Sequence, residues 1–548
     1  MDHFSVDRNS IEDSFLNLSE RTKRFILNSW AKPFADLIFP EINEKRFAVL
    51  YSDNDASRPN NPVNAMIGAL ILKEMFNLTD EELLESIICD PRFQYALHTT
   101  SFIEQPFSDR SFSRFRERLY LYTLETGIDL LHEEMEAMAK VFVKYMGINP
   151  TVKRMDSLMV SSSCKKMSRL EILYTTVANM VKKVDKSKAN KLSGKLKHYL
   201  DSEDRNKVIY HRRNEEISSR LQQVIDDAVI LVAELEGEYS KSTEYQLLAR
   251  VLAEQTELDS KGKKVPKDKK QIKPTSLQNS SDPDATYRFK AGKSHKGYVG
   301  NIVETFDENG AIITAYDYQK NNYSDSQFCK DIVENLGLQD KKTLLLADGA
   351  YASVENFKLA FERNIELITT ALLAKSPNNI HASFQLDTKE HKVIKCPAGH
   401  KPNKTSYYQE TGFYRATFNR NHCENCSLRD QCGAKLQKKS AYVNISEKMV
   451  QRAQYLIKLS SEEYKSLSNK RNGVEGIPSV LRRKYEVDHI PVRGLVRSKI
   501  WFSFKIGAIN VNRVLKKALS SKKALLLRDL FLDFFQILRN QRSILVKS

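Results

Sequence analysis

A short apolar run that ends in an acidic residue constrains the fold of this chain more than any other stretch. Residues 343–347, TLLLA, show no polar face, which is typical of a strand covered on both sides in a mixed α/β sheet. Asp348 stands where the strand ends, and Gly349 permits a sharp exit into a helical pattern, AYASVENFKLAFERN. Because ligands and metal ions bind at the carboxyl ends of strands in open α/β sheets, Asp348 is a candidate metal ligand. Capping of the next helix explains a single aspartate here equally well, so the hypothesis needs partner carboxylates.

The charge balance favours a polyanionic partner. The 548 residues, enough for about two to four domains, include 86 Lys and Arg against 69 Asp and Glu, a formal net charge of +17. The most apolar stretch, ALLLRDLFLDFFQIL, is interrupted by Arg528, Asp529 and Asp533 and is typical of an amphipathic helix, so we expect no membrane partner. The first residues lack the pattern of a signal peptide, which favours the cytoplasm. Nucleic acid is therefore the expected partner.

Residues 1–148 are expected to form a helical domain, because long segments such as PVNAMIGALILKEMFNLTDEELLE space their apolar residues at three and four positions. A further helix, capped by Ser108 or Ser111, carries several arginines. Such a unit would sit on DNA in the manner of helix-turn-helix proteins, with Arg114 and Arg116 as candidate contacts. A packing module with a solvated basic face accounts for the same pattern.

The rest of the chain alternates between strand and helix patterns. An extended segment with Asp156 near its middle, TVKRMDSLMV, precedes a charged helical insertion with a coiled-coil seam and a basic linker. Two or three period-two segments, a helix, the strand before Asp348, another helix and NIELITTALL follow. This order predicts an α/β fold with the five-stranded mixed sheet of an RNase H-like domain. Its core would lie in residues 149–163 and 281–375, interrupted by the insertion at 164–280 and completed by helices in 446–548.

The first and fourth strands of such a sheet are neighbours ~4.8 Å apart, so Asp156 and Asp348 would project side by side. Two adjacent carboxylates repel each other unless a cation lies between them, and hard oxygen ligands suit Mg²⁺ or Mn²⁺. Two such ions ~3.5 to 4 Å apart promote displacement at a phosphodiester. The best third carboxylate is Glu475, which Pro478 places at or near a helix start. The competing acids are Glu486 and Asp488.

Several blocks of the sequence resemble bacterial insertion-sequence transposases of the DDE class. They are MDSLMV, SDPDATYRFKAGKSHKGYVGNIVE, LLLADGAYASVENF, VEGIPSVLRRKY and VRGLVRSKIWFSFKIGAINVNRVLKKA, and the likeness extends over residues 60–518. The resemblance places the catalytic, metal-binding triad on Asp156, Asp348 and Glu475. Many relatives carry a tyrosine, an arginine and a lysine around the glutamate. Here Arg471 and Arg482 keep the charges, whereas Ser468 replaces the tyrosine.

Four of the seven cysteines crowd into residues 376–445, just before Glu475. A C-x₂-C pair and two further cysteines resemble a structural Zn²⁺ site: Cys396, Cys423, Cys426 and Cys432. His400 and His422 are alternative ligands, and reduced cysteines packed as small hydrophobes are the alternative explanation.

The resemblance implies a DNA transposase that cuts double-stranded DNA at the ends of its element and joins it to target DNA. Holding two ends together implies a homodimer on DNA, in the bacterial cytoplasm at the nucleoid. Candidate DNA-binding residues near Glu475 are Arg471, Arg482, Arg483, Lys484 and Arg497. Two alternatives remain open: a catalytically silent DNA-binding descendant, and an RNase H-like nuclease without strand transfer.

Overall fold

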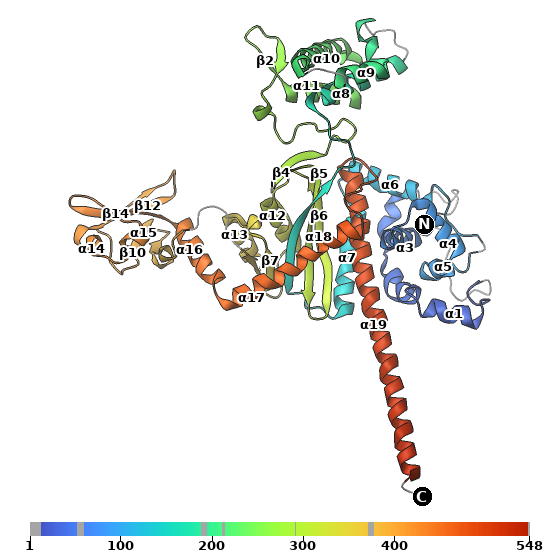
Figure 1. Cartoon of the computed structure of the whole chain (residues 1–548). Helices are drawn as coiled ribbons and strands as arrows, with labels where there is room; N and C mark the ends of the chain where they lie inside the picture. The colour runs from blue at the N-terminus through green and yellow to red at the C-terminus, as the bar shows by residue number, and fades with distance from the viewer. Residues whose placement is uncertain are drawn as a thin grey trace.

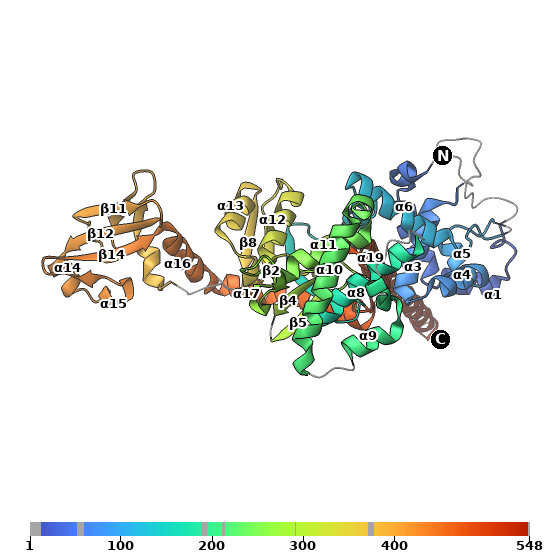
Figure 2. The ribbon, with the colours of Figure 1, turned by 90° about the horizontal axis from the view of Figure 1, so that it is seen from above.

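A mixed sheet lies at the centre of the molecule (Figure 1). The computed structural model describes residues 13–51, 60–102, 104–187, 194–210, 214–290, 292–370 and 377–545, without the side chains of residue 214 and of those beyond 521. The N-terminal helices lie on one side of the sheet, and a helical insertion stands above it. A lobe rich in β structure reaches away on the other side, joined through α16 (Glu447–Leu459) and α17 (Glu462–Arg471) (Figure 2).

Six strands form the central sheet: β1 (Val152–Ser161), β4 (Thr286–Lys290), β5 (Lys293–Asp307), β6 (Gly310–Lys320), β7 (Thr343–Ala347) and β8 (Ile365–Thr369). The order is β6–β5–β1–β7–β8, and β4 pairs with the first residues of β5. Strand β5 is antiparallel to β1, β4 and β6, whereas β1–β7 and β7–β8 are parallel. The predicted mixed α/β sheet is confirmed, but it has six strands and not the predicted five, because all three period-two segments, β4, β5 and β6, join it.

Both faces of this sheet are covered, which explains the missing polar face of residues 343–347. On one face, Met155 and Leu345 pack against α12 (Asp325–Leu336) and α13 (Val354–Glu362). On the other face, Leu158 packs with the N-terminal helices and α19 (Leu495–Leu545), and Leu346 packs with Tyr464 of α17. Alternate residues of β1 and β7 thus point into different cores.

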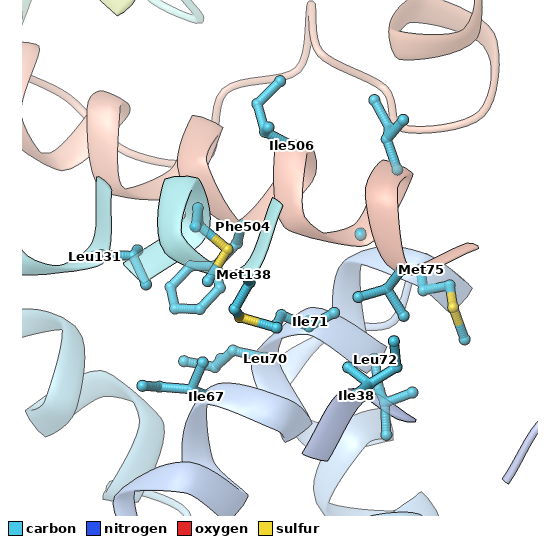
Figure 3. Close-up of a cluster of buried hydrophobic side chains, with 14 of the residues drawn as sticks. Ile38, Ile67, Leu70, Ile71, Leu72, Met75, Leu131, Met138, Phe504 and Ile506 are labelled. Carbon is cyan, nitrogen blue, oxygen red and sulfur yellow. The ribbon is translucent and has the colours of Figure 1, made fainter. Parts of the chain in front are cut away.

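The N-terminal helices share one hydrophobic core with the sheet and α19. They are α1 (Glu20–Leu27), α2 (Ala31–Pro33), η1 (Phe34–Ile38), η2 (Phe39–Glu41), η3 (Glu44–Leu50), α3 (Val63–Phe76), α4 (Asp80–Cys89), α5 (Pro91–Ala96), α6 (Ser111–Thr126) and α7 (Leu130–Met146). Ile71 of α3 and Met138 of α7 lie in the same cluster as Phe504 and Ile506 of α19 (Figure 3). The N-terminal region is helical as predicted, but it does not pack around a core of its own.

The insertion between β1 and β4 has its own core. Its elements are α8 (Arg169–Lys186), η4 (Gly194–Leu200), α9 (Ser202–Ile209), η5 (Asn214–Glu216), α10 (Ile217–Tyr239), α11 (Thr243–Gln255), β2 (Thr256–Leu258), β3 (Lys264–Pro266) and η6 (Lys269–Gln271). The predicted seam residues of α10 from Leu221 to Leu235 are buried in one cluster with residues of α8 and α11, so the seam packs within the chain.

The predicted basic linker is wrong at its start, where β2 and β3 form a hairpin. Arg169 Nη1 donates to the Lys267 carbonyl (2.7 Å) and Gln222 Nε2 to the Lys264 carbonyl (2.8 Å), which fixes the hairpin on α8 and α10. These anchors come from distant helices, so the lysine-rich composition alone did not indicate them.

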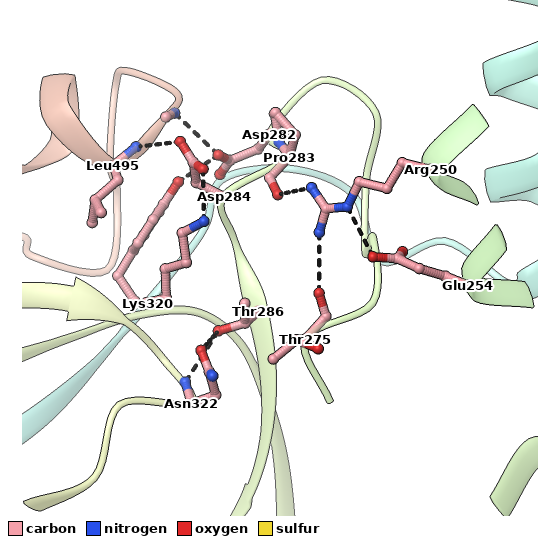
Figure 4. Close-up of polar contacts among 12 residues, drawn as sticks. Arg250, Glu254, Thr275, Asp282, Pro283, Asp284, Thr286, Lys320, Asn322 and Leu495 are labelled. Carbon is pink, nitrogen blue, oxygen red and sulfur yellow. Dashed lines mark hydrogen bonds and ion pairs between the residues drawn. The ribbon is translucent and has the colours of Figure 1, made fainter. Parts of the chain in front are cut away.

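Two aspartates tie the end of the insertion to the C-terminal helix (Figure 4). Asp282 accepts a hydrogen bond from the Gly494 amide (3.0 Å), and Asp284 accepts one from the Leu495 amide (3.0 Å) and pairs with Lys320 (3.1 Å). Carboxylates are favourable at a helix N-terminus, so this segment stabilises the start of α19.

The remaining elements form the β-rich lobe and the C-terminal helices. The lobe contains η8 (Asn379–Ser383), β9 (Gln385–Asp387), β10 (Lys392–Lys395), β11 (Lys404–Tyr408), β12 (Phe413–Asn419), α14 (Arg420–Glu424), α15 (Arg429–Cys432), β13 (Lys435–Leu436) and β14 (Ser440–Ser446). After α16 and α17 come η9 (Asn472–Glu475), α18 (Gly476–Arg483) and α19. Among the described residues, none of the helices combines the length and apolar character needed to span a bilayer.

Candidate active site

The pairing of β1 with β7 brings the first two predicted acids together. The parallel register places Val152 beside Leu344 and Arg154 beside Leu346, and the same register continued by two residues sets Asp156 opposite Asp348. Asp156 lies two residues from Leu158, and Asp348 lies two residues from Leu346. Leu158 and Leu346 face the C-terminal helices, so both acids are expected on that face. Asp348 Oδ1 also accepts hydrogen bonds from the Gly349 amide (2.5 Å) and Thr370 Oγ1 (3.3 Å), so Asp348 caps the turn as well. The two acids therefore share one face of the sheet.

Glu475 approaches from the C-terminal helices. It ends the 3-10 helix η9 and holds the N-cap position of α18, and Pro478 lies in the first turn of α18, as predicted. Its side chain is 58% exposed. The competing Asp488 is paired with Arg482 (3.2 Å).

One arginine joins two of the three acids. The guanidinium of Arg471 lies 3.1 Å from Glu475 Oε1 and 3.5 Å from Asp156 Oδ1. Burial raises the pKa of the Asp156 carboxyl, and the charges of Asp348 and Glu475 raise it further, against the opposing effect of Arg471 and the Ser157 amide. Asp156 is therefore the acid whose protonation depends on the other two. Within the described parts of the chain, no three His, Cys, Asp or Glu side chains are close enough to share one metal ion.

Sequence reasoning missed Arg154, which fixes the turn that carries Glu475. Arg154 pairs with the fully buried Glu304 (2.5 Å), and its Nη1 donates to the Lys470 carbonyl at the end of α17 (2.9 Å). A Cβ atom on Gly473, in η9, would overlap the Arg154 guanidinium. Because residues two apart in a strand share a face, the position of Arg154 two residues before Asp156 was the available signal.

A network of polar side chains lies beside Asp156, starting from the next residue of β1. Ser157 Oγ donates to Asp325 Oδ1 (2.9 Å), and Asn301 Nδ2 donates to the buried Tyr351 hydroxyl (2.7 Å). Burial raises the pKa of Tyr351, and Asp325 and Asp156 add to the effect, so the hydroxyl stays protonated. These side chains hold the strand ends that carry the acids.

The predicted DNA-binding residues are found in different settings. Arg483 and Lys484 are exposed on α18, and Arg482 is 45% exposed while it donates to the Met159 carbonyl (3.1 Å). Arg471 is buried against the acids, as described above. Arg497 is held by Glu117 (2.6 Å) and lies over the Tyr120 ring, so it joins α19 to α6.

In the N-terminal helices, Arg114 is exposed whereas Arg116 pairs with Asp80 of α4. The helix that carries them begins at Ser111, with Arg110 at the N-cap and no side-chain cap. The predicted serine cap is therefore wrong: Ser111 Oγ accepts a hydrogen bond from the Ser108 amide (2.9 Å) outside the helix.

The four cysteines of the lobe surround one small cavity. Cys396, Cys423, Cys426 and Cys432 line a space of about 20 Å³ together with His400 and His422, whose rings stack at 4.3 Å. Burial raises the pKa of the Cys423 thiol to about 11, and the other three cysteines add to this rise. The four cysteine side chains thus line one cavity, and the zinc site that their spacing suggested stays a prediction.

Comparisons with known proteins point to one group. The family model described as "Transposase DDE domain" matches residues 395–515, which include the cysteines, Arg471 and Glu475. The model described as "Transposase domain (DUF772)" matches residues 23–118 of the N-terminal helices. No curated protein matches the chain.

Among solved structures, a piggyBac transposase synaptic complex with hairpin DNA aligns with 92% of this chain and 76% of its own, at 9% identity and a TM-score of 0.29. The family matches lie on both sides of the strands that bear Asp156 and Asp348. Two separate segments of the chain, residues 23–118 and 395–515, are thus similar to transposase families.

Proposed function

We propose that the chain cuts DNA strands at the ends of a mobile element and joins them to target DNA. The observation that carries this proposal is geometric: the β1–β7 register sets Asp156 opposite Asp348, and Arg471 lies 3.5 Å from Asp156 and 3.1 Å from Glu475. The order β6–β5–β1–β7–β8, with the last three strands parallel, supports an RNase H-like core for this activity.

Asp156, Asp348 and Glu475 would hold two Mg²⁺ or Mn²⁺ ions. Their carboxylate oxygens suit these hard cations, and three carboxylates beside one arginine leave an excess of negative charge. Bound ions would activate water, and then a 3′-hydroxyl, and would stabilise the leaving oxygen. The Arg471 guanidinium would release one or both carboxylates as they close around the ions, and Arg154 would hold η9 against β1 during this change.

Double-stranded DNA would bind over the same face. Arg482, Arg483 and Lys484 follow Glu475 on α18 and are exposed, so they can reach phosphates near the acids. The exposed Arg114 of α6 is a second contact that we propose for the N-terminal helices. Since strand joining needs two element ends at once, a homodimer on DNA, at the nucleoid of a bacterial cytoplasm, is part of the proposal.

A structural Zn²⁺ ion would stabilise the lobe. Its core contains few large buried side chains, and small domains commonly need a metal or disulfides to fold stably. Cys396, Cys423, Cys426 and Cys432 offer four thiolates around one cavity of atomic size, and His400 or His422 could replace one of them.

The test is Mg²⁺-dependent cleavage and joining on duplexes that carry the ends of the element encoding this chain. The proposal predicts both activities for the wild type and neither for Asp348→Asn. Cleavage without joining would instead favour a plain nuclease. DNA binding without either activity would favour a silent DNA-binding descendant, and both results would overturn the transposase proposal.

A further inference from the structure

Three separate segments bring positive side chains together where β1 leaves the sheet for the insertion. Lys166 follows β1, Lys293 and Lys296 begin β5, and Arg482 lies at the end of α18. We call Lys166, Lys293, His295, Lys296 and Arg482 the cationic patch.

Backbone pairing fixes this arrangement. Ser161 at the end of β1 pairs with Gly297 of β5, and the Ser162 amide donates to the Lys296 carbonyl (3.0 Å). A Cβ on Gly297 would overlap the Val160 carbonyl, so only glycine permits this close crossing. The segments that carry Lys166 and Lys293 therefore lie side by side just beyond this pairing.

Arg482 and Lys296 are held in place by carbonyl groups. Arg482 Nη2 donates to the Met159 carbonyl (3.1 Å), three residues along β1 from Asp156, and Lys296 Nζ donates to the Met167 carbonyl (3.4 Å). The patch thus begins beside the acid site and continues toward the insertion.

The patch carries uncompensated positive charge. Lys166 and Lys293 are exposed, and neither ammonium has a hydrogen-bond or ion-pair partner in the described segments. Burial lowers the pKa of His295, and Arg482, Lys166 and Lys293 lower it further, whereas Asp488 opposes them. Asp488 is also the ion-pair partner of Arg482 (3.2 Å). Four cations therefore converge with one carboxylate, which costs free energy in the absence of an anionic partner.

We propose that the cationic patch binds the phosphate backbone of the DNA that leaves the acid site toward the helical insertion. This inference rests on the proposed function, because it takes DNA as the substrate of Asp156, Asp348 and Glu475. A duplex carries one negative charge per ~1.7 Å, so a row of cations that continues from the catalytic acids matches a phosphate backbone better than a single small anion. Contacts of this kind position DNA without reading its sequence.

The test uses the full chain, a random-sequence duplex and the double variant Lys166→Gln/Lys293→Gln. The ammonium groups of both lysines have no partner among the described residues, so the variant should fold as the wild type does. The matched control is Lys341→Gln/Lys358→Gln, which removes the same charge. Lys341 and Lys358 are also exposed, and the part of the chain that the structure describes offers no partner to either ammonium group. Lys341 lies before the opposite end of β7 from Asp348.

We expect the Kd of the patch variant at moderate salt to rise at least about fivefold, and the slope of log Kd against log salt to fall by about two. The control should keep the wild-type slope. The proposal would be overturned by equal salt slopes for the wild type and the patch variant, or by equal losses of DNA affinity in the patch variant and the control. DNA cleavage by the wild type would still support the proposed function in either case. Salt-independent binding by the wild type, with no cleavage, would overturn both.

Discussion

The positions of individual side chains around the acids depend on one arginine that takes no part in the proposed chemistry. Arg154 joins β1 to the end of α17 through the Lys470 carbonyl and to β5 through Glu304. Glu304 in turn pairs with Arg513 of α19 (2.7 Å). Arg154 therefore sets how the turn with Glu475 approaches the strand with Asp156.

Two nearby glycines, Gly473 in η9 and Gly476 at the start of α18, test this role. In Gly473→Ala the new methyl group would displace the Arg154 guanidinium, whereas at Gly476 a Cβ meets no atom within 4 Å. We expect Gly473→Ala to lower the rate of cleavage at least about tenfold, because a shift of about 1 Å at a catalytic group costs up to ~100-fold. DNA affinity should change less than about twofold. Gly476→Ala should cleave as the wild type does, and an equal loss in both variants would contradict the positioning role of Arg154.

Among single residues, the sequence predicted the positions of those acids whose placement depends only on the local sequence pattern. Asp348 ends an apolar run and Glu475 precedes a proline in a first helical turn, so both could be placed on elements without a structure. The contacts of Arg471 with Asp156 and Glu475 could not be predicted, because they depend on the angle at which the end of α17 approaches β1. Spacing along the chain carries no information about that angle.

Among the elements, α16 and α17 are held on the edge strand β8 by a charged cluster. Glu366 of β8 accepts from Lys342 (2.7 Å), Lys458 (2.5 Å) and the Tyr464 hydroxyl. Burial alone would raise the pKa of the Glu366 carboxyl, but these three hydrogen bonds lower it to about 2. The cluster joins the base of the lobe and the Glu475 segment to the sheet.

The cluster predicts a pH-dependent stability difference between the wild type and Glu366→Gln. In the unfolded chain this carboxyl titrates near 4.3, so its contribution is complete above that pH and disappears as the pH falls toward 2. Near neutral pH we expect Glu366→Gln to destabilise α16–α17 by about 1 kcal/mol, a value reduced for solvent screening. Hydrogen exchange of residues 447–471 measures this difference, with the exposed Glu362→Gln as control. A difference that persisted at pH 2 would contradict the ionic origin.

The lobe makes a separate prediction about metal. Cys423→Ser should lower the zinc content of the purified protein by about one equivalent per chain and increase hydrogen exchange in residues 377–446, since a structural zinc ion contributes folding free energy. Cys89→Ser, at an exposed cysteine outside the lobe, should change neither quantity. A wild-type protein that contains no zinc and does not bind it when it is added would contradict the prediction.

The order of elements was predictable where the hydrophobic period changes from helix to strand. The mixed sheet followed from that change. The β2–β3 hairpin could not be predicted, because its lysines gave it the composition of a linker. The residues that anchor it, Arg169 and Gln222, lie on α8 and α10. Tertiary contacts there outweigh local propensity.

Across the whole molecule, α19 connects parts of the chain that are far apart in sequence. Its residues pack with α3, α7 and the sheet in one cluster. Lys505 Nζ lies 2.6 Å from Glu74 Oε2 of α3, and both side chains are largely buried. An ion pair between residues so far apart in the sequence cannot be predicted from local sequence pattern. The N-terminal region was therefore predicted as a separate domain.

This buried pair makes the N-terminal helices depend on α19 for stability. Lys505→Met would leave the Glu74 carboxylate buried, with Lys73 at 3.5 Å as its one remaining ion-pair partner among the described residues. We therefore expect a loss of about 2 to 3 kcal/mol in the free energy of unfolding. The double variant Lys505→Met/Glu74→Leu should recover most of it, because an apolar pair replaces two charges. Urea unfolding measures both changes. A double variant as unstable as the single one would show that the pair is not the cause.

The central claim is that acids from three parts of the chain form one divalent metal site. Titration of the full-length protein with Mn²⁺, followed by electron paramagnetic resonance, tests it most directly. The account predicts that Asp156→Asn, Asp348→Asn and Glu475→Gln each weaken Mn²⁺ binding at least about tenfold, while Glu486→Gln binds as the wild type does. Unchanged binding in Glu475→Gln, or a loss in Glu486→Gln, would contradict it.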